Sequence, residues 1–400
     1  MNQLPKSLLQ KLHQREENNS LRTLPVSNKL IDFSSNDYLG FAQNETIFNN
    51  AHQYLIDNNI KINGATGSRL ISGNHNLFNT AEDCIAAFHQ SESALIFNSG
   101  YDANVGFFSS VAQRNDIILY DELCHASIRD GIQLSNAKAY KFQHNDCENL
   151  ESIIKNLELK IITSNNFHTS EPATFNVQRS TYYIVTESVF SMDGDSPNIE
   201  QLVKLCDKYN AYLVVDEAHS LGVFAENGEG LTQSVGLQDK IFARIMTFGK
   251  GLGCHGAAIL GSNDLKKYLV NFARSFIYTT ALSPHSVATI LTAYQHLAAN
   301  KTAINQLNAN IKIFNQSTFQ LGLKPLFVYS KSAIQSAIIP GNVTVKTIAN
   351  HLQESGFDVK AILSPTVPEG QERLRFCIHS YNSREEITQV LLLLQSLLIV

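Results

Sequence analysis

The sequence lacks the features of membrane proteins and of disulfide-bonded secreted proteins. No apolar run approaches the roughly 20 residues that a membrane span needs. The opening stretch, MNQLPKSLLQKLHQREENN, has no apolar core long enough for a signal peptide. The six cysteines are scattered and include no C-x-x-C pair. Because scattered cysteines of this kind are typical of reduced thiols, we expect a cytoplasmic protein.

An excess of basic charge is also missing. Asp and Glu outnumber Lys and Arg by 36 to 31, which gives a net charge of -5 and leaves no electrostatic footprint for nucleic acid. Hydrophobic residues make up 44% and charged residues 17%, a composition that argues against disorder. A chain of 400 residues can form one large domain and a smaller one. We therefore expect a globular enzyme that binds neither nucleic acid nor membrane.

The tetrapeptide Asp216-Glu217-Ala218-His219 spells a motif of nucleic-acid helicases, but the matching nucleotide site is missing. Such a site needs a P-loop, G-x-x-x-x-G-K-[ST], whose amides bind the phosphates. The only Gly-Lys pair is Gly249-Lys250, and Gly251 follows where Ser or Thr is required. A DEAH-type ATPase remains only as a remote alternative.

A second glycine motif, Gly251 to Gly256, fits the dinucleotide fingerprint G-x-G-x-x-G. The letters AAIL that follow it favour a strand, whereas the fingerprint must open a helix. No βαβ unit with an acidic residue at the required distance follows either. We therefore do not expect a dinucleotide site here.

From about residue 80, short apolar strands alternate with helices. Strands are predicted over 93–98, 116–120, 182–186, 212–216 and 243–248, and a helix over 198–210. Continuous apolar strands separated by helices are typical of a mostly parallel sheet buried on both faces. Ligands of such sheets bind beyond the carboxyl ends of the strands. Glu187, Asp216 and Thr247 fall at or just past such ends, so we expect them to converge on one cleft.

The pattern changes after Pro284 and predicts a small α+β domain. It contains helical stretches over 284–299 and 301–320, then AIQSAIIPG, a helix from about Val345, RLRFCIH and a final helix from Ser383. Leucines at helical spacing predict a further helix over 5–17. We predict an N-terminal segment (1–45), a large domain (46–283) and a small domain (284–400). Residues 158–181 are poorly patterned and receive no assignment.

Asp216, His219 and the glycine-rich segment around Lys250 together suit one cofactor. An Asp near a pyridine nitrogen keeps it protonated, which makes the ring an electron sink, and a lysine supplies the covalent link. Glycines let the backbone approach a bulky cofactor closely. Each residue alone has an ordinary explanation, a helix N-cap for the Asp and a solvated surface position for the Lys. Charged residues in apolar, glycine-rich surroundings instead favour a pyridoxal 5'-phosphate (PLP) site, with no metal ion.

Eight motifs in order along nearly the whole chain extend this prediction. They are FSSNDYLG (33–40), GATGSRLISG (64–73), FNSGYDAN (97–104), DELCHASIRDG (121–131), TESVFSMDGD (186–195), VVDEAHSLG (214–222), TFGKGLG (247–253) and RLRF (373–376). With them the chain resembles the α-oxoamine synthase family of fold-type I PLP-dependent enzymes. The resemblance implies an α/β fold with a large, mostly parallel-sheet domain and a small α+β C-terminal domain.

The resemblance also assigns the cofactor site residue by residue. Lys250 forms the covalent link to PLP, Asp216 pairs with the pyridine nitrogen, and His125 stacks on the ring. His219 and Ser191 hydrogen-bond the phenolic oxygen. The phosphate is bound by the amides of Gly100 and Tyr101, by the Thr247 hydroxyl and, from the neighbouring subunit of a homodimer with shared active sites, by Thr279 and Thr280.

The reaction implied is a decarboxylative condensation of an amino acid with an acyl thioester of coenzyme A or an acyl-carrier protein. Lys250 removes the Cα proton and His125 acts as an acid toward the thioester carbonyl. Arg375 binds the amino-acid carboxylate, Asn36 lies in the cleft, and Arg22 meets the distal end of the acyl chain.

Two further segments bear on the substrates. SKSAIQS (330–336) and SPTVPEG (364–370) resemble segments of the family members that use L-alanine with a pimeloyl thioester, so the resemblance implies 8-amino-7-oxononanoate, for biotin biosynthesis, as the product. Glycine with acetyl-CoA, and serine with a palmitoyl thioester, remain open because Phe78, Ala81 and Ser364 depart from the family pattern.

Overall fold

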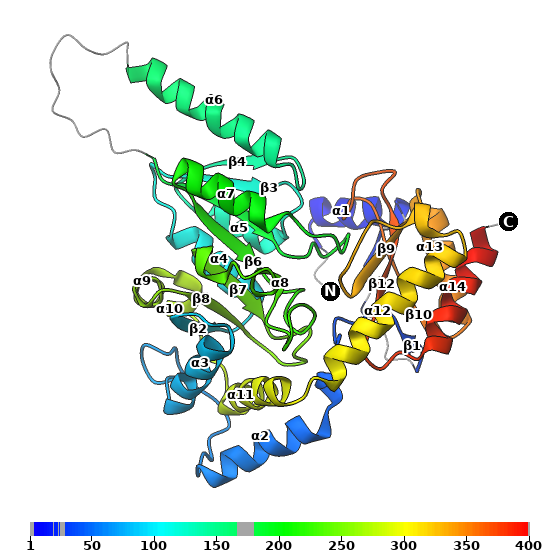
Figure 1. Ribbon diagram of the computed structural model, residues 1–400, viewed down its shortest axis with the longest axis horizontal. Helices are drawn as coiled ribbons and strands as arrows, with labels where there is room; N and C mark the ends of the chain where they lie inside the picture. Colours follow the sequence, from blue (N-terminus) through cyan, green and yellow to red (C-terminus); the bar gives the residue numbers. More distant parts are fainter. Residues whose placement is uncertain (1–3, 19, 23, 25–28, 166–179, 399–400) are drawn as a thin grey trace. The chain divides into compact units, whose positions relative to one another are not determined.

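The computed structural model describes residues 4–18, 20–22, 24, 29–165 and 180–398 (Figure 1). The chain forms two compact units. The larger unit comprises residues 39–190 and 196–301, and the smaller unit comprises 1–38, 191–195 and 302–400. The three-part division expected from the sequence stays a prediction.

A seven-stranded sheet forms the centre of the larger unit. Its order is β2 (Ser93–Phe97), β8 (Ala257–Gly261), β7 (Ala243–Thr247), β6 (Tyr212–Asp216), β5 (Tyr182–Glu187), β3 (Ile117–Asp121) and β4 (Lys138–Phe142). Strand β8 is antiparallel to both its neighbours, and all other pairs are parallel. The mostly parallel α/β sheet predicted from the apolar runs is therefore confirmed.

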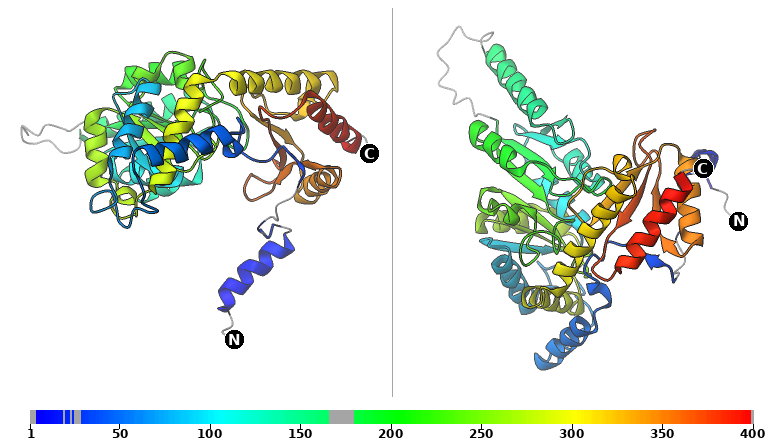
Figure 2. Two further views of the ribbon diagram at one scale, coloured as in Figure 1. Left: turned by 90° about the horizontal axis from the view of Figure 1, so that it is seen from below. Right: turned by 45° about the vertical axis from the view of Figure 1, so that its right-hand side comes forward.

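Helices cover both faces of this sheet, as the continuous apolar strands require (Figures 1 and 2). Successive strand residues point to opposite faces, so Val214 packs in one core, whereas Leu213 and Val215 pack in the other. The first core includes residues of α4 (Gly100–Ser110), α5 (Ala126–Gln133), α9 (Asn263–Phe272) and α10 (Arg274–Ile277). The second includes residues of α6 (Cys147–Asn165) and α7 (Ile199–Tyr209). The remaining helices of this unit are α2 (Glu45–Asp57), α3 (Asn76–Phe88), α8 (Leu231–Ser234) and α11 (Pro284–Ala299).

The smaller unit is an α+β structure. Its antiparallel sheet has the order β11 (Lys360–Ile362), β12 (Arg373–Cys377) and β9 (Ile334–Ile338). A short parallel pair joins β1 (Ile31–Asp32) to β10 (Phe357–Asp358). Its helices are α1 (Lys6–Glu17), α12 (Thr302–Gln320), α13 (Asn342–Glu354) and α14 (Arg384–Leu398).

The predicted elements are confirmed with small shifts at their ends. The five strands and the helix over 198–210 lie within a residue of their predicted bounds, and α13 begins three residues before Val345. The AAIL segment is strand β8, so the second glycine motif leads into a strand as expected. Helix α6 occupies the first part of the unassigned segment 158–181, and residues 166–179 lie outside the described residues. Within the described parts of the chain, no helix combines the length and the apolar character that crossing a membrane requires.

Candidate active site

Three neighbouring parallel strands of the larger unit end on residues that the sequence placed at strand ends. β5 ends at Glu187, β6 at Asp216 and β7 at Thr247. Glu187 is the register partner of Asp216, and Asp216 is the register partner of Ile245. This edge of a parallel sheet is where α/β folds bind ligands. The carboxyl groups of Glu187 and Asp216 are both buried there.

The Asp216 carboxylate is held at both oxygens. The amide of Ala218 donates to Oδ1 at 2.9 Å, and Asn104 Nδ2 donates to Oδ2 at 2.8 Å. The amide of Ser188 donates to the Asp216 carbonyl at 2.8 Å, which fixes the main chain. Each carboxylate oxygen thus accepts a hydrogen bond, which fixes the orientation of the group. The group is therefore suited to pairing with a protonated pyridine nitrogen.

Lys250 lies beside His219, with 2.7 Å between Lys250 Nζ and His219 Nε2. The glycines after Lys250 let the segment that follows β7 pack closely against two other parts of the main chain. A Cβ on Gly251 would lie 2.3 Å from the Leu221 carbonyl oxygen, and a Cβ on Gly253, where φ is +61°, would lie 2.1 Å from the Ala42 amide nitrogen. These two glycines thus make room for neighbouring backbone, whereas the sequence suggested that they make room for a cofactor.

His125 caps the N-terminus of α5. Its Nδ1 accepts the amide of Ser127 at 3.2 Å, and its own amide donates to Glu187 Oε1 at 2.5 Å. Burial lowers the pKa of His125, and the nearby Asp216 carboxylate opposes that shift. Burial, together with the neighbouring Asp216 charge, raises the pKa of Glu187 to about 8.

The N-terminus of α4 forms a cradle suited to an anion. Ser99 is its N-cap, and the Ser99 hydroxyl accepts the amide of Asp102 at 3.0 Å. A Cβ on Gly100 would lie 2.4 Å from Thr247 Oγ1, so the Thr247 hydroxyl lies at the first residue of this 11-residue helix. Because helix N-termini attract phosphate, the structure brings together Gly100, Tyr101 and Thr247 as the phosphate prediction requires.

Thr279 and Thr280 lie close to this loop within the same chain. Asn98 Nδ2 donates to Thr279 Oγ1 at 3.0 Å and to the Thr280 carbonyl at 2.6 Å. Asn98 precedes Gly100 by two residues. The contribution of the two threonines from a neighbouring subunit stays a prediction.

Three predicted site residues meet in the smaller unit. Arg375, on β12, is 8% exposed. Its Nε donates to the Ser191 carbonyl at 2.7 Å and its Nη2 donates to Asn36 Oδ1 at 2.9 Å. The guanidinium is thereby oriented by fixed acceptors, as recognition of a carboxylate requires. Arg22 lies elsewhere in this unit, where it lines a cavity of about 170 Å³ with Arg15 and residues 361–366.

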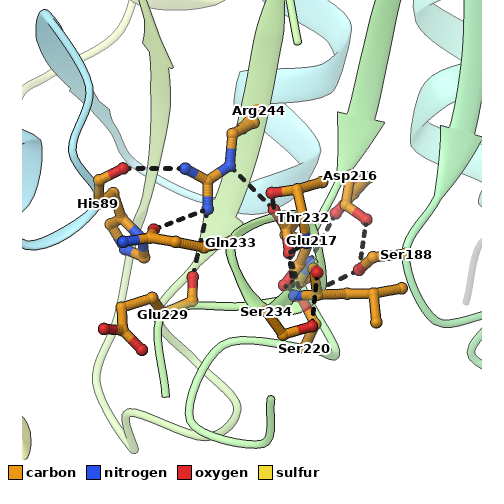
Figure 3. Close-up of polar contacts among 12 residues, drawn as sticks. His89, Ser188, Asp216, Glu217, Ser220, Glu229, Thr232, Gln233, Ser234 and Arg244 are labelled. Carbon is orange, nitrogen blue, oxygen red and sulfur yellow. Dashed lines mark hydrogen bonds and ion pairs between the residues drawn. The ribbon is translucent and has the colours of Figure 1, made fainter. Parts of the chain in front are cut away.

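Glu217, the residue after β6, belongs to a buried network of polar side chains (Figure 3). The side chain is 0% exposed. Its Oε1 accepts Arg244 Nε at 2.9 Å and the Thr232 hydroxyl, and its Oε2 accepts the Ser220 hydroxyl and the Leu231 amide, both at 2.7 Å. With its oxygens occupied in this way, Glu217 holds the main chain after β6 in place, and its catalytic inactivity stays a prediction.

Arg244 completes this network from β7. It is 3% exposed and donates to the His89 carbonyl at 3.0 Å and the Glu229 carbonyl at 3.3 Å, in addition to Glu217 (Figure 3). A guanidinium can serve all three acceptors because its donors point in fixed, diverging directions. The Glu217–Arg244 pair links the segment after β6, which carries His219, to β7, the strand that precedes Lys250.

Sequence reasoning missed two residues of this edge, Asn104 and Ser127. Both are buried, at 2% and 1% exposure. The available signal was weak: an asparagine in the interior of the apolar helix α4 is unusual, because its side chain competes with the helix backbone for hydrogen bonds.

Comparisons with known proteins identify the family. The model of the family described as Aminotransferase class I and II matches residues 28–392. The 8-amino-7-oxononanoate synthase of Emericella nidulans is 39% identical over an alignment that covers 96% of this chain and 93% of that protein. The chain belongs to the α-oxoamine synthase family.

Solved structures of the family share the fold of this α-oxoamine synthase. The 8-amino-7-oxononanoate synthase of Francisella tularensis matches with a TM-score of 0.74 at 27% identity, over 93% of this chain and 99% of that one. The serine palmitoyltransferase of Sphingomonas wittichii matches with a TM-score of 0.85 at 25% identity, over 99% and 98%. The fold-type I prediction is therefore confirmed, and the family's cofactor is PLP.

The residues of the larger unit fit this cofactor. Thr247 Oγ1 and the first residue of α4 form a cradle that a single added Cβ would fill, as a phosphate site requires. The Asp216 carboxylate is 5% exposed and keeps two neutral donors. Lys250 offers a primary amine beside His219. These groups would supply the carboxylate partner, the covalent anchor and the anion site that PLP needs.

Proposed function

We propose that this α-oxoamine synthase joins L-alanine to a pimeloyl thioester and releases 8-amino-7-oxononanoate, carbon dioxide and the free thiol. The observation that carries the proposal is the 39% identity to the 8-amino-7-oxononanoate synthase of Emericella nidulans, over nearly the full length of both chains. The match to serine palmitoyltransferase of Sphingomonas wittichii supports a second candidate, serine with a palmitoyl thioester.

In the proposed reaction, bound PLP supplies an electron sink for negative charge at the amino-acid Cα. Asp216 keeps the proton on the pyridine nitrogen, and its two hydrogen-bond donors hold the carboxylate in place for this. Lys250 takes the Cα proton, and His219 orients its amine at 2.7 Å. A carbon–carbon bond then forms at the thioester carbonyl while the carbon–sulfur bond breaks, so that the thiolate of coenzyme A or a carrier protein leaves. The amino-acid carboxylate is lost as carbon dioxide, and a proton returns to the electron pair left on Cα.

Three further roles belong to the same proposal. His125 donates a proton toward the thioester carbonyl oxygen. Arg375 binds the amino-acid carboxylate, and its contacts to Ser191 and Asn36 support this by fixing the guanidinium. Arg22 binds the distal carboxylate of the pimeloyl chain; its place on the wall of a cavity beside Arg15 supports a site for negative charge.

A homodimer with shared active sites is part of the proposal, as is a cytoplasmic location. Ile71 is 87% exposed and Tyr278 is 73% exposed. The segments that carry them are joined by a 3.0 Å hydrogen bond from the Ala281 amide to the Gly67 carbonyl. Exposed large apolar side chains on two segments that are bonded to each other favour a protein partner. Sedimentation as a dimer is the expected result, and a monomer with full activity would contradict it.

The decisive experiment pairs three amino acids with three thioesters. Purified protein with PLP is offered alanine, glycine and serine, each with pimeloyl, acetyl and palmitoyl thioesters. We expect turnover chiefly with alanine and pimeloyl thioester; turnover only with serine and palmitoyl, or only with glycine and acetyl, would overturn the proposal. Lys250→Ala should abolish both turnover and the visible absorbance band of bound PLP. Lys240→Ala, an exposed lysine of the same unit, is the matched control.

A further inference from the structure

A chain of hydrogen bonds joins Asp216 to His125 through two side chains that have no assigned role. Asn104 Nδ2 lies 2.8 Å from Asp216 Oδ2 and 3.0 Å from Ser127 Oγ. Ser127 Oγ lies 2.7 Å from His125 Nδ1. Asn104, Ser127 and Asp216 are 2%, 1% and 5% exposed, so water hardly competes for these bonds. The chain therefore links the end of β6, through α4, to the N-terminus of α5.

The direction of each bond follows from the groups that cannot donate. An ionised carboxylate only accepts, so Asp216 must face the amide nitrogen of Asn104. The flipped amide would set Asn104 Oδ1 2.8 Å from a carboxylate oxygen, which is repulsive. The second hydrogen of that nitrogen points to Ser127 Oγ, and the hydroxyl keeps its own single hydrogen to donate to His125 Nδ1.

The main chain gives a second, independent reason to expect no proton on His125 Nδ1. The amide of Ser127 also donates to His125 Nδ1, at 3.2 Å, as the N-cap bond of α5. A ring nitrogen carries no proton while it accepts an amide N–H, but at 3.2 Å this bond is longer than the 2.7 Å bond from the hydroxyl, which is therefore the stronger constraint. Two donors therefore converge on Nδ1, one from the hydroxyl and one from the main chain of the same residue.

We propose that Asn104 and Ser127 are positioning residues that hold His125 in the tautomer with its proton on Nε2. The ionised Asp216 orients the Asn104 amide, and that amide orients the Ser127 hydroxyl. The hydroxyl donates to His125 Nδ1, so this nitrogen stays unprotonated. The Asp216 carboxylate thus serves two purposes. It pairs with the pyridine nitrogen, and it determines which tautomer the stacking residue His125 adopts. The use of this tautomer in catalysis rests on the proposed function, because a general acid toward a thioester carbonyl must present an N–H.

The charges around the ring are consistent with a neutral imidazole, in which the choice of tautomer matters. Burial lowers the pKa of His125, as do the positive charges nearest the ring, whereas Asp216 and Asp130 raise it. The charged groups come from β5, β6, α5 and the loop after β7, and are Glu187, Asp216, Arg129, Asp130 and Lys250.

Nitrogen NMR of ¹⁵N-histidine-labelled protein without PLP tests the proposal. His125 is assigned by the signal that is missing in His125→Gln. We expect an unprotonated Nδ1 and a protonated Nε2 in the wild type. Ser127→Ala removes the hydroxyl donor from Nδ1, so the pKa of His125 should rise by roughly half to one unit and both tautomers should appear. Ser127→Thr, which keeps a hydroxyl, should restore the wild-type pattern.

Ser110→Ala is the matched control, because this α4 hydroxyl bonds only main-chain carbonyls of its own helix, Gly106 at 2.7 Å and Phe107 at 3.4 Å. A protonated Nδ1 in the wild type would overturn the proposal, as would a Ser127→Ala spectrum like that of the control. Asn104→Leu frees the Ser127 hydroxyl and should also produce mixed tautomers, so unchanged signals there would overturn it even if Ser127→Ala fails to fold. Absent turnover with the expected tautomer in place would count against the proposed function alone.

Discussion

Replacing Arg244 with methionine should destabilise the larger unit far more than the loss of a surface charge. Arg244 and Glu217 are 3% and 0% exposed, and 2.9 Å separates Nε from Oε1. Without the guanidinium, the carboxylate of Glu217 remains buried with only neutral donors, and the carbonyls of His89 and Glu229 each lose a donor. Removing one partner of such a pair costs about 3 to 5 kcal/mol, because an uncompensated charge stays in the interior.

This cost can be converted into a change of the thermal midpoint. Unfolding entropy is about 2.1 cal/mol/K per residue, so 400 residues give about 0.8 kcal/mol per degree. Arg244→Met should therefore lower the midpoint by about 4 to 6 °C. Adding Glu217→Gln removes the uncompensated charge, so the double variant should be more stable than the two single changes predict by addition.

Scanning calorimetry at one protein and one PLP concentration measures these midpoints, since bound cofactor shifts them by mass action. Lys301→Met is the matched control, because it breaks an ion pair with Glu226 in which both side chains are exposed. Its midpoint should stay within about 1 °C of the wild type. An Arg244→Met midpoint equal to that of the control, or strict additivity in the double variant, would refute the reasoning.

Two further predictions concern the cofactor cradle and the strand-end acids. Gly100→Ala should raise the Kd for PLP at least about 10-fold, because its Cβ would lie 2.4 Å from Thr247 Oγ1; absorbance titration measures this, and Gly64→Ala, whose Cβ meets nothing within 4 Å, should bind like the wild type. Glu187→Gln keeps an acceptor for the His125 amide and removes the acid whose pKa burial raises to about 8. The stability from protonated Glu187 is complete below its ordinary pKa of 4.5 and is lost as the pH rises through about 8. The midpoint of PLP-free Glu187→Gln relative to the wild type should therefore rise between about pH 4.5 and about pH 8 and level off above that, and a constant difference would contradict this.

The sequence predicted the central sheet well because most of its strands are buried on both faces. β6, for example, reads as a continuous apolar run before Asp216, and its last four residues are buried. Strand β4, with the sequence KAYKF, was missed because it is one of the two edge strands and only its Phe142 is buried. An edge strand has one neighbour to pair with, so its residues need not be apolar and its pattern resembles that of a loop.

The candidate site was predictable where a residue type has its own chemistry, as with Lys250 and Asp216. The residues that orient them were not. Asn104 reaches Asp216 across 112 residues of sequence and Ser127 across 23, so only the packing of α4 against α5 and β6 brings them together. The sequence at the end of β6 also does not show which of the two adjacent acids, Asp216 or Glu217, faces the site. In the structure, Glu217 pairs with Arg244 in the protein interior.

The composition of the smaller unit has a consequence for the synthesis of this chain. Residues 191–195 belong to that unit although both flanking segments belong to the larger one. The hydrogen bond to the Ser191 carbonyl cannot form until Arg375, 184 residues later, has been synthesised, and the contact of Asp193 cannot form before Arg373. At about 5 to 20 residues per second, the ribosome needs roughly 10 to 40 s to supply these partners. During that interval the partners of residues 191–195 in the smaller unit have not yet been synthesised, so this segment reaches its folded contacts only late in translation.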